Sequence, residues 1–339
     1  MFEVKDDSVA PLHTLPPVGW SSEEVITAAT KVLAMGKYDG RKVLSIRRSH
    51  YRQGRCIHAA PDGYIQTLRS LQSSTLRIFP GVRKMEAEIV KMTLETSIQG
   101  DKDAAGCKRP RRTLVWGHLK SASRNAYIGA VAHHMAPLPV PQMTTGGSES
   151  LLLAMKAARD WSREVKGITE PEIVLCYTAH AGFDKGASLL DVKLRKVDMD
   201  PVTCKVDLRA MRRAITSNTV MLVASAPQYP HGIIDDVEGV ASLGKDKNIP
   251  VHVDCCMGGF LLPFMKAAGY PVPPFDFQVP GVTSISADTH KYGQAPKGSS
   301  VLMYRSNDYL HHQYFVTPNW PGGIYATHSI PGSRAGGYT

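Results

Sequence analysis

From about residue 144 onward the chain alternates between short apolar runs and amphipathic stretches, and this alternation restricts the fold more than any other feature. Helical patterns cover 148–166, 207–215 and 236–247. The rhythm predicts an α/β fold with an open, mostly parallel sheet whose ligands gather at the carboxyl ends of the strands. The runs typical of buried parallel strands are EIVLCY (172–177), VKLRKV (192–197), TVMLVAS (219–225), PVHVD (250–254), VTSISA (282–287) and SVLMY (300–304).

The part of the chain before residue 144 is less regular. Residues 21–36 form a helical pattern, with Ser21 or Ser22 as the N-cap and a glutamate in the first turn, and residues 79–98 form another. The stretches 37–77 and 107–142 have no sustained period and are rich in Arg, Ser and His. We expect these two stretches to be loop or disorder.

The positive charge of the chain is concentrated in the same region. The formal net charge is +10, yet residues 41–140 hold 18 of the 40 Lys and Arg against 6 of the 30 Asp and Glu. The remaining 239 residues therefore carry 22 basic against 24 acidic side chains. Because the chain has no recognised nucleic-acid-binding fold, we expect no nucleic-acid partner. We hypothesise that the irregular segments derive from frame-shifted or unspliced coding sequence; recovering both from a mature transcript would contradict this.

Cysteine spacing and hydropathy exclude several classes of protein. The six cysteines have no paired CxxC spacing and are too few for a disulfide scaffold, so we expect no metal site and a reducing compartment. No run of 18 apolar residues occurs, and the first 20 residues are acidic and proline-rich. We therefore expect a cytoplasmic chain without its own membrane span or secretory signal.

The string SADTHKYG (286–293) places His290 and Lys291 just after a predicted strand. Taken alone, an exposed loop lysine is the better explanation. However, the strand PVHVD ends in Asp254, and a carboxylate at the end of a buried strand needs a partner. A turn cap and a protonated pyridine nitrogen explain Asp254 about equally well. Lysine together with aspartate is the pair that pyridoxal phosphate chemistry requires.

Two further strings point to ligand contacts. In TTGGSES (144–150), Gly146, Gly147 and Ser148 run into the helical pattern, where free amide groups and the helix dipole would favour a phosphate group. A glycine-rich helix start is also a common N-cap, so the string is weak evidence alone. His180 follows a strand in YTAH, and stacking on a planar cofactor and a structural role are equally compatible with that position.

Together, TTGGSES, YTAH, VHVDCCMGGF and SADTHKYG resemble the pyridoxal-phosphate-dependent group II decarboxylase superfamily in order and spacing. PEIVLCYTAHAGFDKGAS, IPVHVDCCMGGFLLPFMKAAGY and WPGGIYATHSIPGSRAGG are similar to its sphingosine-1-phosphate lyase family in particular. The resemblance is dense over 144–337, clear over 79–106 and thin before that. It implies a fold-type I PLP-dependent transferase (aspartate aminotransferase-like) large domain with a mostly parallel seven-stranded sheet.

The resemblance also implies roles for particular residues. Lys291 would be the Schiff-base lysine, Asp254 the partner of the pyridine nitrogen, and His180 the residue that stacks on the ring. The catalytic set is thus Lys291, His180 and Asp254, with pyridoxal 5'-phosphate as the cofactor. The residues expected to seat the cofactor phosphate are Gly146, Gly147, Ser148 and His290.

The reaction implied is a carbon–carbon lyase step on a sphingoid-base phosphate. An external aldimine would form with the substrate amine, and retro-aldol cleavage would release a long-chain aldehyde and phosphoethanolamine. The family also implies a homodimer and a location at the endoplasmic reticulum membrane, facing the cytosol. The alternatives are an amino-acid decarboxylase of the same superfamily and a catalytically dead, truncated product; PHGIIDDVEGVASL and GSRAGG favour the lyase over the decarboxylase.

The resemblance divides the chain into five parts. Residues 1–78 form an N-terminal segment that is partly irregular, and 79–106 a helix leading into the cofactor domain. Residues 107–143 are expected to be an atypical basic insertion before the cofactor-binding large domain at 144–310. Residues 311–339 would begin the connection to a C-terminal small domain that is missing here.

Overall fold

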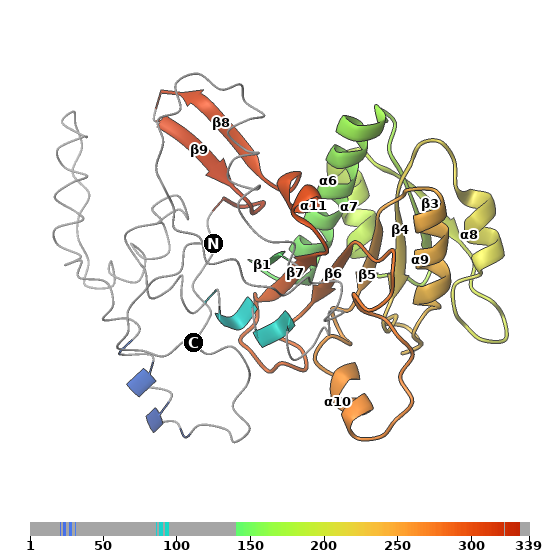
Figure 1. Cartoon of the computed structure of the whole chain (residues 1–339), viewed down its shortest axis with the longest axis horizontal. Helices are drawn as coiled ribbons and strands as arrows, with labels where there is room; N and C mark the ends of the chain where they lie inside the picture. The colour runs from blue at the N-terminus through green and yellow to red at the C-terminus, as the bar shows by residue number, and fades with distance from the viewer. Residues whose placement is uncertain are drawn as a thin grey trace, which may run out of the picture.

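The computed structural model describes residues 140–321 and 323–332, together with positions 21, 23–24, 27–28, 31, 86, 88–90 and 92–94. A seven-stranded sheet runs through the larger part, in the order β1-β7-β6-β5-β4-β2-β3 (Figure 1). Its strands are β1 (Val140–Thr144), β2 (Glu172–Cys176), β3 (Lys193–Val197), β4 (Thr219–Ser225), β5 (Val251–Asp254), β6 (Ser284–Ala287) and β7 (Ser300–Tyr304). The helices are α6 (Gly147–Lys166), α7 (Gly182–Leu190), α8 (Leu208–Ala214), α9 (Val237–Asp246), α10 (Leu262–Ala267) and α11 (Asn307–His311).

The sheet is mostly parallel, as the alternation predicted. Strands β3, β2, β4, β5 and β6 pair in parallel, whereas β7 is antiparallel to both of its neighbours, β6 and β1. The six predicted strands and the helices expected over 148–166, 207–215 and 236–247 are all present. The fold class is confirmed: it is an α/β fold with a mostly parallel sheet of seven strands.

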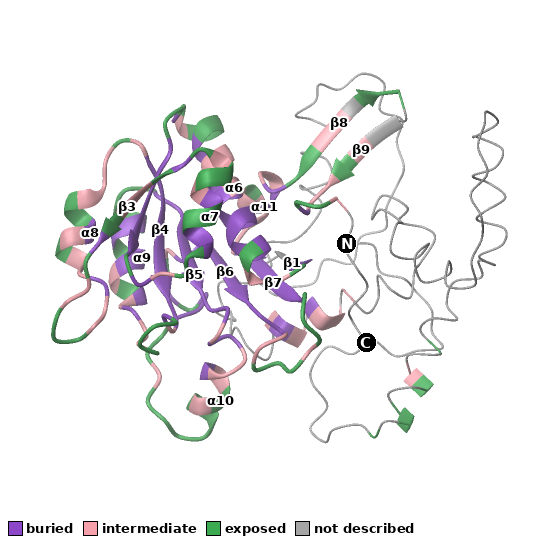
Figure 2. Ribbon diagram, turned by 180° about the vertical axis from the view of Figure 1, so that it is seen from behind, coloured by how far each residue is buried: buried purple, intermediate pink, exposed green. Residues whose placement is uncertain are grey.

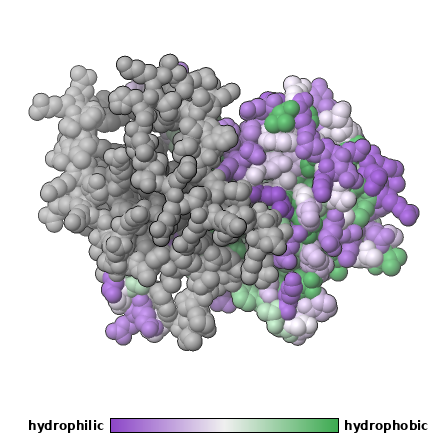
Figure 3. Space-filling model, viewed as in Figure 1, coloured by the Kyte–Doolittle hydropathy of each residue, from purple (hydrophilic) through white to green (hydrophobic). Residues whose placement is uncertain are grey.

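Helices cover both faces of this sheet, which explains why its central strands are apolar on both sides. Alternate residues of the central strands β2 and β4 contribute to different apolar clusters, as Val174 and Ile173 of β2 do. One cluster lies against α8 and α9 and the other against α6 and α7. Figure 2 shows the sheet as a buried layer between exposed helix faces. The outer face over α8 and α9 is mostly hydrophilic (Figure 3).

Several elements were not predicted. Residues 140–142, in a stretch expected to be irregular, form the start of β1, because this segment pairs antiparallel with β7. Helices α7, α10 and α11 are too short to give a clear period. After α11, β8 (Phe315–Trp320) and β9 (Gly323–Thr327) pair as a separate antiparallel hairpin within the segment expected to begin a connection.

Upstream of residue 140 only scattered positions are described. Those at 23, 24, 27, 28 and 31 are helical, and the Ser21 Oγ accepts the N–H of Glu24 while the Glu24 carboxylate accepts the N–H of Ser21. This reciprocal pair is a capping box, which confirms Ser21 as the N-cap. The described positions between 86 and 94 are helical too. The stretches 37–77 and 107–139 lie outside the described residues. Within the described part, no helix is both long and apolar enough to cross a bilayer.

A buried ion pair anchors the amino end of the sheet and provides a test of the fold. Glu172, at the start of β2, is 5% exposed and accepts hydrogen bonds from Arg195 on β3 and from the Thr216 hydroxyl (2.7 Å). The hydrogen bonds from Arg195 outweigh the effect of burial and lower the pKa of Glu172 to about 2.

We expect Glu172→Gln to lower the free energy of unfolding at pH 7 by about 1–3 kcal/mol, because Arg195 loses a charged acceptor. Because the pKa of Glu172 is lower in the folded chain than in the unfolded chain, its ionised carboxylate stabilises the fold at pH values above 4.5. This stabilisation is lost as the pH falls from 4.5 toward 2. The difference between variant and native chain should therefore shrink over that range in urea titrations. Asp184→Asn, which breaks the exposed pair with Lys196, is the control and should change stability by less than about 1 kcal/mol. A pH-independent effect of Glu172→Gln would contradict the prediction.

Candidate active site

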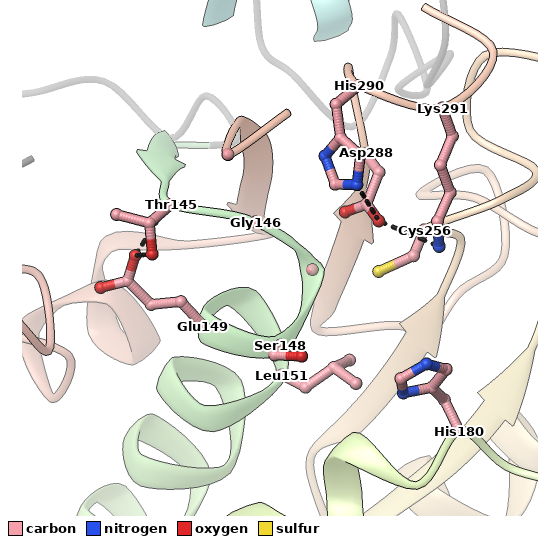
Figure 4. A pocket seen from close by; sticks show the side chains of 12 residues that line it. Thr145, Gly146, Ser148, Glu149, Leu151, His180, Cys256, Asp288, His290 and Lys291 are labelled. Atoms are coloured by element: carbon pink, nitrogen blue, oxygen red, sulfur yellow. Dashed lines mark hydrogen bonds and ion pairs between the residues drawn. The ribbon is translucent and has the colours of Figure 1, made fainter. Parts of the chain in front are cut away.

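A cavity of about 340 Å³ opens at the carboxyl ends of the parallel strands. The segments around it come from far apart in the sequence: the start of α6 and the turns that follow β2, β5 and β6 (Figure 4). This is where an open parallel sheet binds its ligands. The residues that line the cavity are Thr145, Gly146, Gly147, Ser148, Glu149, Leu151, His180, Cys256, Asp288, His290, Lys291 and Gly298.

Helix α6 points its amino end into this cavity. Gly146 precedes the helix with φ 136°, a conformation that favours glycine, and no side chain caps the first turn. The first amide groups of a helix have no partner within the helix, and the helix dipole makes this end positive. The arrangement suits a phosphate group, as the TTGGSES string predicted.

Glu149, in the first turn of α6, holds the turn that precedes the helix. Its carboxylate is 7% exposed and accepts the N–H (2.6 Å) and hydroxyl (2.8 Å) of Thr145. The other carboxylate oxygen accepts the N–H of Ile330 (2.7 Å), which follows the β8–β9 hairpin. Glu149 therefore fixes the glycine turn and connects it to the segment after β9.

Lys291 lies in the turn after β6 and lines the cavity. Its Nζ is 3.0 Å from Oδ2 of Asp288, which is 2% exposed, while the lysine side chain is 31% exposed. Burial would lower the pKa of Lys291, but the neighbouring negative groups, Asp288 foremost, raise it above the usual value. Lys291 thus supplies an amine to the cavity, and the Asp288 carboxylate forms an ion pair with it.

Two histidines also contact this cavity, with different hydrogen bonds. His290 donates from Nδ1 to the carbonyl oxygen of Ser299 (2.6 Å), so its Nε2 faces Asp288 at 3.7 Å. The Nδ1 of His180 accepts the N–H of Gly182 (2.9 Å), which leaves Nε2 as the protonated nitrogen of the neutral ring. The His180 ring is exposed at the side of the cavity opposite Lys291 (Figure 4).

Asp254 lies immediately beside the cavity rather than among its lining residues. It ends β5, is 7% exposed, and its Oδ1 accepts the N–H of Cys256 (3.0 Å) and the hydroxyl of Ser286 (3.4 Å). His252 bonds the same Ser286 through Nε2 (3.2 Å), and burial lowers the pKa of His252 to about 4. A neutral, fully buried imidazole therefore supports the serine that contacts Asp254.

Sequence reasoning named seven site residues, and the structure brings six of them to one cavity: Gly146, Gly147, Ser148, His180, His290 and Lys291. The seventh, Asp254, lies beside them through Cys256, which does line the cavity. Glu149, Cys256 and Asp288 also line the cavity but were not predicted as site residues. They lie within the motifs TTGGSES, VHVDCCMGGF and SADTHKYG, but their contacts with Ile330, Ser286 and Gly147 join residues far apart in the sequence.

The chain is similar to known proteins of one family. The profile of the pyridoxal-dependent decarboxylase conserved domain matches residues 130–329. Sphingosine-1-phosphate lyase of Drosophila melanogaster is 43% identical over 336 residues, 96% of this chain and 53% of that protein. Sphingosine-1-phosphate lyase 1 of Rattus norvegicus is 50% identical over 261 residues, 77% of this chain and 39% of that protein. The chain spans about half the length of the curated relatives it matches, or less.

Solved structures with the same fold are similar to the chain as well. The sphingosine-1-phosphate lyase of Burkholderia pseudomallei superposes with a TM-score of 0.67 at 32% identity, covering 96% of this chain and 68% of that one. Glutamate decarboxylase of Lactobacillus brevis superposes with a TM-score of 0.58 at 18% identity, with the same coverage, which shows a shared fold alone. The predicted fold type is therefore confirmed by structure as well as by sequence.

Proposed function

The chain belongs to the pyridoxal-dependent decarboxylase family, and on that basis we propose that it is a pyridoxal-phosphate-dependent lyase acting on a sphingoid-base phosphate. The products would be a long-chain aldehyde and phosphoethanolamine. The observation that carries the proposal is that Lys291 and the start of α6, where no described side chain caps the helix, line the same cavity. The identity to proteins named sphingosine-1-phosphate lyase supports the choice of substrate.

The residues around the cavity fit pyridoxal 5'-phosphate. The amino end of α6, with Gly147 and Ser148, offers free amide groups for a phosphate, and His290 lies beside it. Lys291 supplies the amine for the aldehyde group. The buried Asp254 carboxylate is a suitable counter-ion for a protonated pyridine nitrogen, and the exposed ring of His180 offers a flat surface for stacking.

The cofactor, when bound, supplies an electron sink for cleavage of the bond between the second and third carbons of the substrate. The chain's own residues then have separate tasks. Asp254 holds its negative charge in a buried position, fixed by the Cys256 N–H and the Ser286 hydroxyl. His180 keeps its Nδ1 occupied by the Gly182 N–H, so the ring orientation is fixed.

Gly147 provides a test of the phosphate seat. A Cβ at this position would lie 2.7 and 2.8 Å from the carboxylate oxygens of Asp288 and 3.0 Å from the Cys256 sulfur. Since Asp288 is buried and short, we expect Gly147→Ala to displace it at an overpacking cost of about 1–3 kcal/mol. Cofactor affinity, measured by absorbance titration, should fall about tenfold or more for a cost at the middle of that range. Gly167→Ala, at the other end of α6, meets no described atom within 4 Å but strains a left-handed backbone (φ 68°). It is therefore the control for a destabilising glycine change outside the cavity, and it should leave cofactor affinity unchanged. Native affinity in Gly147→Ala would argue against the seat.

The proposed reaction is tested with the full chain. Sphingosine 1-phosphate is supplied to chain reconstituted with pyridoxal 5'-phosphate, and the aldehyde and phosphoethanolamine are measured together. Release of carbon dioxide from amino acids, without aldehyde, would favour the alternative that the family's name suggests, an amino-acid decarboxylase. Cofactor binding with neither activity would identify the polypeptide as a catalytically dead product, and the proposal would fail.

We also propose a homodimer at the cytosolic face of the endoplasmic reticulum membrane. The resemblance to the lyase family supports both points, and the amphiphilic substrate supports a location beside a membrane. Light scattering of the purified chain should give twice the mass of 37.0 kDa. Cell fractionation should recover the chain with the reticulum; a monomeric mass or a different compartment would refute the corresponding part of the proposal.

A further inference from the structure

Asp288 is a buried carboxylate that the fold by itself does not require. It lies in the turn between β6 and Lys291 and is 2% exposed. Its Oδ2 is 3.0 Å from the Nζ of Lys291, but its Oδ1 has no hydrogen-bond partner among the described residues. Burying a carboxylate with half of its acceptor capacity unused is unfavourable, so a role in the site explains it better than a role in folding.

The position of this carboxylate depends on two other parts of the site. Its oxygens lie so close to Gly147 that no larger residue fits there without displacement. They therefore face the amino end of α6, where the helix dipole favours a negative charge. The carboxylate is thus held between a helix end and the lysine, and Lys291 is the flexible member of the pair.

The other titratable groups around Lys291 form no ion pair with its ammonium among the described residues. His290, on the same turn, is directed to Ser299 through Nδ1, and His180 faces the cavity from the turn after β2. At the end of β5, burial raises the pKa of the Cys256 thiol well above its usual value, which keeps it neutral. Asp254 uses its Oδ1 for the Cys256 N–H. Within the described residues, the ion pair of Lys291 is the one with Asp288.

We propose that Asp288 is a positioning residue that binds the Lys291 ammonium whenever the lysine is not joined to the cofactor, and so determines the pH at which this amine becomes nucleophilic. The inference rests on the proposed role of Lys291 as the cofactor anchor. The substrate would enter as an ammonium, and its replacement of the lysine would leave that proton on the Lys291 Nζ, where Asp288 would hold the resulting ammonium. The lysine then stays close enough to return.

The test measures the reactivity of Lys291 itself. The full chain is freed of cofactor with hydroxylamine and treated with limiting acetic anhydride from pH 6 to 11, and acetylation of each lysine is quantified by peptide mass spectrometry. In the native chain, Lys291 should react with a midpoint above that of the exposed Lys185 on α7. Asp288→Asn should increase the rate at Lys291 about tenfold at pH 8, the change that one pKa unit produces.

Two further variants separate positioning from general damage. Asp288→Glu keeps the charge and should preserve most of the protection of Lys291. Asp184→Asn removes the surface partner of Lys196 and should leave Lys291 unchanged. An unaltered Lys291 profile in folded Asp288→Asn would overturn the proposal. If that variant does not fold, the native chain decides: a Lys291 midpoint at or below that of Lys185 refutes the ion pair.

This experiment is independent of the proposed function. Acetylation is measured without cofactor, so Asp288-dependent protection of Lys291 can be present even if the chain shows no cofactor absorbance. In that case the anchor role fails and the ion pair stands. Conversely, the cofactor absorbance could depend on Lys291 while the pH profile of Lys291 acetylation is the same in the native chain and in Asp288→Asn. That result would support the proposed function and refute this inference.

Discussion

Replacing Lys291 by alanine is expected to abolish the visible absorbance of the cofactor-loaded chain and to reduce lyase turnover by about a thousandfold or more, the scale on which loss of an essential acid–base or covalent group acts. Lys291 is the one residue with a side-chain amine among the described residues that line the cavity. Titration with pyridoxal 5'-phosphate, followed by absorbance and by product formation, measures both effects.

The matched control is Lys185→Ala on α7, an exposed lysine outside the cavity lining. It should bind the cofactor as the native chain does. Thermal unfolding should show that Lys291→Ala is folded, because a side chain that is 31% exposed makes a limited packing contribution. A saturable band of native position in Lys291→Ala would falsify the assignment of this residue as the anchor.

Asp254→Asn is expected to lower turnover by about 10²–10⁴-fold while leaving the chain folded. An asparagine carbonyl can still accept the N–H of Cys256, so the end of β5 keeps its geometry. A neutral amide is no counter-ion for a protonated pyridine nitrogen, so the electron sink weakens. The expected loss of turnover is the rate factor that a positioned general acid or base typically contributes in enzymes. Steady-state turnover measured at saturating cofactor isolates the effect from binding.

Asp276→Asn provides the comparison for Asp254→Asn. Asp276 is also buried, at 4% exposure, and its Oδ1 accepts the N–H of Gln278, but it does not line the cavity. The Asp276→Asn variant should lower the free energy of unfolding more than it lowers turnover. Equal losses of turnover in both variants would mean that the loss in Asp254→Asn reflects a damaged fold rather than a missing charge.

Much of the site was open to prediction because its residues lie at the ends of predicted strands. The carboxyl ends of parallel strands meet at one edge, so His180, Asp254 and Lys291 could be expected together without any long-range information. Glu149 was not identified, because its partner Ile330 lies 181 positions away. Asp288 was not predicted as a site residue, since neither its burial nor its approach to Gly147 is visible in a local pattern.

Strands β2 to β7, the long helix α6 and the resemblance to the family could be predicted from the amino-acid sequence. These depend on period, apolar runs and short motifs, which are local properties of a chain. The antiparallel pairing of residues 140–144 with β7, and the approach of Asp288 to both Lys291 and the start of α6, could be seen in the folded chain alone. The physical reason is that strand pairing and burial depend on neighbours far apart in sequence, and a local pattern contains no information about them.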